Sequence, residues 1–185
     1  MTEQHWGPTI SGDIVVIGGG SAGIGLLASL LKRDPDLNIT LIEPNDHHCY
    51  QPAWTLVGGG AYDLKKTRRP LADVLPNGVT WIQAAVSEVL PDEQTLLLDS
   101  GQRVSWQHLI VCPGLRLAWE AIEGLQDTLG QHGVTSNYSY EYAAYTWQLV
   151  QQLKGGKAIF TQPAMPIKCA GAPQKAMYLS CDHWL

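Results

Sequence analysis

Residues 13–43 read DIVVIGGGSAGIGLLASLLKRDPDLNITLIE, and this stretch decides the fold of the first part of the chain. It opens with Ile14–Ile17, an apolar β-branched run that predicts a buried strand. Residues 24–33 are rich in Leu and Ala and predict a helix. A second apolar run, Ile39–Ile42, predicts another strand and leads directly to Glu43. The order strand, helix, strand predicts a β-α-β unit.

The turn between the first strand and the helix fits the pattern G-x-G-x-x-G at Gly18, Gly20 and Gly23. Gly18 permits a tight turn, Gly20 lets the backbone approach a pyrophosphate, and Gly23 lets the helix pack closely on the strand. Ser21 and Ala22 open the helix, whose first N–H groups and positive dipole end attract phosphate charge. The acid after the second strand lies about twenty residues beyond the last glycine, which is the spacing of a carboxylate that binds a ribose hydroxyl. These features predict a dinucleotide site, and a simple tight turn is the alternative.

A membrane-spanning helix is a second alternative for the same region. Ile14–Leu31 contains 18 residues without a charge, which is near the length of a spanning helix. Five glycines within the segment and the strand pattern before them favour a buried strand and helix instead.

The composition is that of a globular protein, with 45% hydrophobic and 16% charged residues in 185. The formal net charge of −5 offers no basic surface for nucleic acid, so we expect no nucleic-acid partner. Residues 1–12 form a polar N-terminal arm without the basic and apolar regions of a secretory signal. We therefore expect a cytoplasmic protein.

The cysteines and histidines do not predict a metal site. Cysteines occur at positions 49, 112, 169 and 181, with no C-x-x-C pair and no zinc spacing. Asp46–Trp54 contains two histidines and a cysteine, but three adjacent residues cannot easily close on one ion. We expect no metal, and we interpret residues 44–60 as a loop that covers the cofactor.

The middle of the chain alternates short apolar runs with turns. Residues 68–75 predict a short helix, and strands are predicted at 79–83, 84–90, 95–98, 103–105 and 109–111. These strands form a β-meander and one further apolar strand. Ser139 predicts the N-cap of a helix at residues 140–153, and we interpret the aromatic side chains of that helix, Tyr142, Tyr145 and Trp147, as packing residues.

A second strand–loop–helix unit is predicted to open with a strand at residues 157–161. Its loop lacks another G-x-G-x-x-G and contains Cys169, just before a helix whose first turn suits Pro173. The helix N-terminus and the nearby Lys168 and Lys175 favour a thiolate, which is the nucleophile of sulfur chemistry. A buried, inert cysteine is the alternative.

Four segments, residues 14–23, 50–60, 136–139 and 166–175, resemble the sulfide:quinone oxidoreductase family, in the branch that includes the mitochondrial enzyme. The last segment is the most specific. The resemblance implies an α/β flavoprotein with a three-layer, Rossmann-like FAD-binding domain, built from a parallel sheet and an antiparallel β-meander. The start of a second dinucleotide-type domain follows. The corresponding ranges are an N-terminal arm at 1–12, the first part of the FAD domain at 13–133, and the start of the second domain at 134–185.

The resemblance also implies a reaction and the residues that serve it. Sulfide attacks a bridge between cysteines, electrons pass to FAD and then to ubiquinone, and the sulfane sulfur leaves to an acceptor. Cys169 is implied to be the catalytic cysteine that attacks the flavin as a thiolate. The residues implied to hold FAD are Gly18, Gly20, Ser21, Ala22, Gly23, Glu43, Pro44, Gln51, Val86 (against the adenine) and Gly114. Cys112-Pro113 departs from the family pattern, so only backbone contact is expected at Gly114.

Members of the family continue beyond this length and supply a second redox cysteine and a C-terminal region that binds quinone and the inner membrane. Cys181 is no substitute, because three helical turns would place it roughly 18 Å from Cys169. We expect that the 185 residues alone do not turn over sulfide and bind FAD weakly. Apolar residues at 159–160 and 177–179 need cover, which predicts a homo-oligomer, with an isolated domain of limited stability as the alternative. The peripheral contact of the intact enzyme with the inner membrane would come only from the further region.

Two other functions remain open from the sequence. One is a type II NADH dehydrogenase, and the other is a non-catalytic FAD-binding remnant. The missing second glycine motif and the presence of Cys169 argue against the NADH dehydrogenase.

Overall fold

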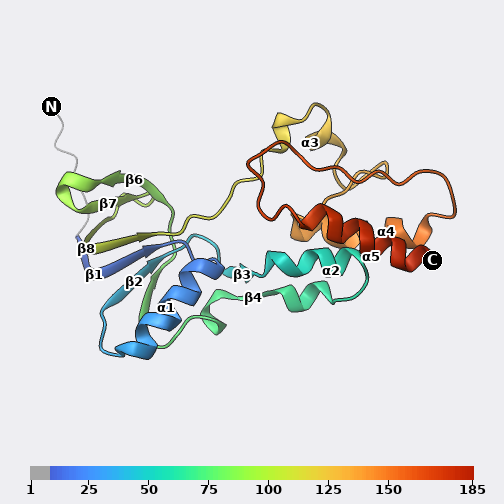
Figure 1. Cartoon of the computed structure of the whole chain (residues 1–185). Coiled ribbons are helices and arrows are strands. Elements are labelled where there is room, and N and C mark those ends of the chain that lie inside the picture. Colours follow the sequence, from blue (N-terminus) through green and yellow to red (C-terminus); the bar gives the residue numbers. More distant parts are fainter. Residues whose placement is uncertain (1–8) are drawn as a thin grey trace. The chain divides into compact units, whose positions relative to one another are not determined.

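The structure is a computed structural model that describes residues 9–185, and these form two compact units (Figure 1). The first unit comprises residues 9–48 and 69–115. The second comprises Cys49–Arg68 and Arg116–Leu185. Each unit is described by itself below.

One mixed sheet organises the first unit. Its strands are β1 (Ile10–Ile17), β2 (Ile39–Ile42), β5 (Val79–Ile82), β6 (Val86–Leu90), β7 (Thr95–Leu98) and β8 (Arg103–Val111). The order is β5-β2-β1-β8-β7-β6, in which β5, β2, β1 and β8 run parallel and β8, β7 and β6 form an antiparallel meander. Helix α1 (Ser21–Arg33) connects β1 to β2. This architecture confirms the predicted α/β fold with a parallel sheet and a β-meander.

The apolar run of β1 lies between two hydrophobic cores, because neighbouring strand residues point to opposite faces. Val16 packs in a core with Leu27 of α1. Val15 packs in a second core with Leu96 of β7 and Val104 of β8. Each of these side chains is completely buried, and such burial stabilises by about 1.5–3 kcal/mol per side chain. The parallel strands are thus covered by a helix on one face and by the meander on the other.

Helices build the second unit. They are α2 (Trp54–Gly58), α3 (Leu125–Thr128), α4 (Tyr140–Gln152) and α5 (Ala172–Trp184), with 3-10 turns η1 (Gln51–Ala53), η2 (Leu64–Thr67) and η5 (Trp119–Ala121). Trp54, Val57 and Ala143 form its core between α2 and α4. The predicted cap of α4 is confirmed, since the Ser139 side chain accepts a hydrogen bond from the Glu141 N–H at 3.2 Å.

The aromatic side chains of α4 pack, as the sequence predicts. The Trp147 ring meets the His183 ring of α5 edge to face, with 4.8 Å between the ring centroids. The Tyr145 hydroxyl accepts a hydrogen bond from the Gly133 N–H at 3.2 Å. Both contacts hold neighbouring segments of the second unit against α4.

Several predicted elements differ from the structure. Residues 157–161 form no strand; a strand needs a hydrogen-bonded neighbour, and no described segment pairs with this one. Residues 44–60 are not a continuous loop, because they contain β3 (His47–Cys49), η1 and α2. Residues 68–75 form β4 (Arg68–Pro70), which pairs with β3, and the turn η3 (Leu71–Asp73) rather than one helix. Residues 103–111 form one strand, β8, whereas the sequence predicted two shorter strands at 103–105 and 109–111.

The predicted domain ranges of 13–133 and 134–185 stay a prediction. The boundaries of the two compact units differ from these ranges, because residues 49–68 pack with residues 116–185. Part of the predicted N-terminal arm, residues 10–12, lies in β1, where Ile10 pairs with Val104; residues 1–8 lie outside the described residues. The region considered as a membrane span is β1 and α1, and over residues 9–185 no helix is both long and apolar enough to cross a bilayer.

Candidate functional site

The turn from β1 into α1 requires glycine at its first position. Gly18 has φ of +102°, and a Cβ there would lie 2.0 Å from the carbonyl oxygen of Cys112. Cys112 is held in place because its N–H donates to the Ile17 carbonyl at 2.8 Å. The end of β8 therefore lies directly against the turn, which leaves no room for a side chain at residue 18.

The other two glycines of the motif have opposite surroundings. A Cβ on Gly23 would lie 2.0 Å from the Gly18 carbonyl oxygen, so α1 packs directly on the turn. A Cβ on Gly20 would meet no atom within 4 Å. Gly20 is the N-cap of α1, no side chain caps the helix, and its first turn carries no acid. The first N–H groups of a helix have no intrahelical partner, so this open end suits a phosphate.

Glu43 lies at the carboxyl end of β2, where it contacts the same turn. One carboxylate oxygen accepts from the Gly19 N–H at 2.8 Å, and the other accepts from the Asn45 N–H at 2.8 Å. The Glu43 carbonyl accepts from the Trp81 indole at 2.9 Å, and the next carbonyl, of Pro44, accepts from the Gln83 amide at 3.3 Å. The structure thus brings the predicted ribose carboxylate to the predicted pyrophosphate turn.

The other predicted cofactor residues are placed differently. Gly114 follows β8 with φ of +75° and has open space where a Cβ would lie. Val86 begins β6 and packs, partly buried, against the core on the meander side. Gln51 belongs to the second unit, where its side-chain oxygen accepts from the Lys168 ammonium. That contact was not predicted, and it gives Gln51 a partner next to Cys169.

Cys169 is an exposed free thiol on the loop that precedes α5. Its carbonyl accepts from the Ala172 N–H at 3.0 Å, at the first residue of the helix, and Pro173 lies in the first turn as predicted. The Tyr138 hydroxyl donates to the carbonyl oxygens of Lys168 and Cys169. Burial raises the pKa of Tyr138, and the nearby Cys169 thiolate raises this pKa further. Sequence reasoning missed Tyr138, for which the only signal was its place in a segment of family resemblance.

The other cysteines differ from Cys169 in their surroundings. Cys49 packs against the core formed by Trp54, and this burial raises the pKa of its thiol, with a smaller opposing effect from Arg68. Cys181 lies within α5, and all four cysteines are free. Among residues 9–185, no group of three or more His, Cys, Asp or Glu side chains is arranged to hold a metal ion.

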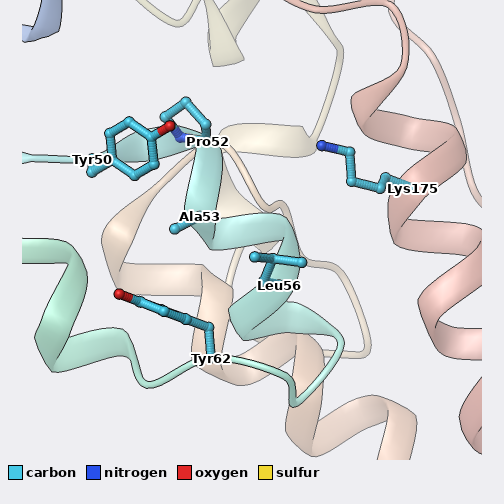
Figure 2. A pocket seen from close by; sticks show the side chains of 6 residues that line it. All are labelled: Tyr50, Pro52, Ala53, Leu56, Tyr62 and Lys175. Atoms are coloured by element: carbon cyan, nitrogen blue, oxygen red, sulfur yellow. The ribbon is translucent and has the colours of Figure 1, made fainter.

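A cavity of about 310 Å³ opens in the second unit (Figure 2). Its apolar wall comes from η1 and α2, its two phenols lie on one side, and a lysine of α5 lies across from them. The lining residues are Tyr50, Pro52, Ala53, Leu56, Tyr62 and Lys175.

Comparison with known proteins identifies the family. The model of the family described as "Pyridine nucleotide-disulphide oxidoreductase" matches residues 12–150. The chain belongs to this family. The mixed sheet of the first unit therefore has the flavin- or dinucleotide-binding fold of this family.

Relatives within the family confirm the resemblance to sulfide:quinone oxidoreductases. The chain is 44% identical over 168 residues to the mitochondrial sulfide:quinone oxidoreductase of Mus musculus, covering 91% of this chain and 37% of that protein. It is 40% identical over 174 residues to the Dictyostelium discoideum protein of the same name, covering 93% and 38%. The crystal structure of the Aquifex aeolicus sulfide:quinone oxidoreductase matches with a TM-score of 0.62 and 26% identity, covering 76% of this chain and 32% of that one. The chain spans less than two fifths of the length of these curated relatives.

Proposed function

We propose that this chain forms the first FAD-binding portion and the cysteine loop of a sulfide:quinone oxidoreductase. The observation that carries the proposal is the exposed Cys169 at the start of α5, in a chain 44% identical to a protein of that name. A second dinucleotide motif would place the pattern G-x-G-x-x-G in that loop, and this chain lacks the pattern and carries a thiol there.

The dinucleotide is proposed to be FAD. Gly18, Gly20 and Gly23 shape a turn with open space at its centre, and Ser21 and Ala22 present the N–H groups of the first turn of α1. Glu43 is proposed to exchange part of its contact with the backbone for a ribose hydroxyl. Pro44, Gln51, Val86 and Gly114 complete the proposed set, with backbone contact only at Gly114.

When bound, FAD would supply a ring that accepts two electrons. The contribution of this chain is to hold a sulfur nucleophile. Cys169 is exposed to an incoming sulfur species, and the N-terminal end of α5 favours negative charge on the thiolate. The Lys168 ammonium, held by Gln51, adds positive charge next to this residue. The thiolate is the form of cysteine that attacks sulfur.

The remaining partners are proposed from the relatives. Sulfide is the proposed electron donor, ubiquinone the electron acceptor, and a small nucleophile the acceptor of the sulfane sulfur. Two relatives are named as mitochondrial proteins, and we propose a peripheral position on the inner membrane for the whole protein. The exposed Ile159, Phe160 and Tyr178 support the proposed homo-oligomer, since apolar side chains of this size favour burial against another surface.

Three spectra of the whole gene product, purified with added FAD, test the proposal against its alternatives. Loss of the flavin absorbance band on anaerobic addition of sulfide supports the proposed oxidoreductase. Loss with NADH and not with sulfide favours a type II NADH dehydrogenase. Bound FAD that neither reagent reduces favours a non-catalytic FAD-binding protein.

A further inference from the structure

The loop that carries Cys169 is held by a phenol from a distant part of the sequence. Tyr138 lies just before α4, and its hydroxyl donates to the carbonyl oxygens of Lys168 and Cys169, the latter at 3.3 Å. The Tyr138 side chain thereby contacts the backbone of two consecutive residues of the loop. This contact lies entirely within the second unit.

The backbone at Cys169 needs such support. Its φ of +62° is in the left-handed region, which a residue with a side chain adopts only when its surroundings impose it. Two further contacts act on the same loop: the Ala172 N–H donates to the Cys169 carbonyl at 3.0 Å, and the Lys168 ammonium donates to Gln51. The Tyr138 hydroxyl completes this set at the thiol-bearing residue itself.

The phenol remains a donor over the range in which thiols react. Burial raises the pKa of Tyr138, and the negative charge of a Cys169 thiolate raises it further. A neutral phenol can donate to carbonyl oxygens, whereas a phenolate cannot. The contact is therefore intact at neutral pH.

We propose that Tyr138 is a positioning residue for Cys169, whose hydroxyl fixes the loop so that the thiol stays at the N-terminal end of α5. A thiol held there gains from the helix dipole, and a thiol on a free loop does not. The inference rests on the proposed function in one respect, namely that Cys169 is the reactive cysteine. Beyond the proposed function, the inference assigns the positioning of the Cys169 thiol to Tyr138.

The test is the alkylation rate of Cys169 in Tyr138→Phe, followed by mass spectrometry with iodoacetamide. Loss of one hydrogen bond to the loop corresponds to about fivefold slower reaction near pH 7. Near pH 9.5 the rates should agree within about twofold, because an unperturbed cysteine thiol is largely ionised at that pH. Tyr145→Phe is the matched control, since it also removes a hydroxyl that contacts the backbone, at Gly133, and it should match the wild type at both pH values.

Equal rates near pH 7 for Tyr138→Phe and the wild type would overturn the inference. Slower reaction at both pH values would also overturn it, because that result reports reduced access to the thiol and not its position at the helix. Cys169→Ser identifies the alkylated peptide. If wild-type Cys169 reacts no faster than Cys181, the proposed function fails, while the ratio of Tyr138→Phe to wild type still decides the positioning role.

Limited trypsin digestion gives an independent measurement. Cleavage after Lys168 should be about fivefold faster in Tyr138→Phe, because the loop is released. Cleavage after Lys154, which follows α4, should be unchanged, and that result shows that the fold is retained. Unchanged cleavage after Lys168 would contradict the inference.

Discussion

Replacing Gly23 by alanine tests the packing between α1 and the glycine turn, and Gly25 provides a matched control two residues further along the same helix. The added Cβ at Gly23 would lie 2.0 Å from the Gly18 carbonyl oxygen, a backbone atom that cannot rotate away. The added Cβ at Gly25 would meet no atom within 4 Å. The two substitutions are chemically identical, so their difference reports the packing alone.

The expected free energies of unfolding follow from these distances. Insertion of a methyl group into a packed site costs about 1–3 kcal/mol, and the short distance to a backbone oxygen favours the upper end. Alanine in place of glycine in a helix returns about 1 kcal/mol. Gly23→Ala should therefore be less stable than the wild type by about 2 kcal/mol, and Gly25→Ala more stable by up to about 1 kcal/mol.

Thermal unfolding followed by circular dichroism measures the difference. At about 2–4 °C per kcal/mol for a chain of this length, the two variants should unfold roughly 6–12 °C apart. Gly23→Ala should also bind FAD more weakly, since the turn that faces the phosphate is displaced. Equal unfolding temperatures for the two variants would refute the direct packing of α1 on the turn.

Three further substitutions give distinct outcomes. Gly20→Val should unfold near the wild-type temperature, because open space surrounds the added side chain, yet weaken FAD binding more than about tenfold in a fluorescence titration, since the pyrophosphate needs that space. Thr67→Val removes the hydroxyl that accepts from the buried Trp54 indole at 3.0 Å, and urea unfolding should show a loss of about 1–3 kcal/mol. Burial raises the pKa of the Cys49 thiol above its ordinary value of 9.0, so the stability that the neutral thiol contributes to the folded state is complete below about pH 9 and is lost as pH rises through the folded pKa. The urea midpoint of the wild type should fall at alkaline pH more steeply than that of Cys49→Ala.

The sequence predicted the first unit well because its pattern is local. Strand, glycine turn, helix and second strand follow one another within residues 13–43, and Gly18 and Gly23 each have a steric reason that sequence spacing already implies. The position of Glu43 beside Gly19 follows from the parallel pairing of β1 and β2, which also depends on the same short stretch.

The second unit was predicted less well because its structure depends on contacts between distant segments. Residues 157–161 have a strand-like composition, but a strand forms only beside a partner, and composition does not report one. Likewise, the contact of Tyr138 with the Cys169 loop joins residues about 30 positions apart. Neither periodicity nor a short motif signals such a contact. The helix after Cys169 was predicted because Pro173 is a local signal for the first turn of a helix.

The central claim is that Cys169 carries sulfide oxidation in an FAD-binding protein of this family. The most direct measurement is the anaerobic loss of flavin absorbance on addition of sulfide to the whole gene product with bound FAD, compared between the wild type and Cys169→Ser. The account predicts rapid loss in the wild type and none above background in the variant, with FAD content equal in both. Flavin reduction by sulfide at the same rate in Cys169→Ser would contradict it.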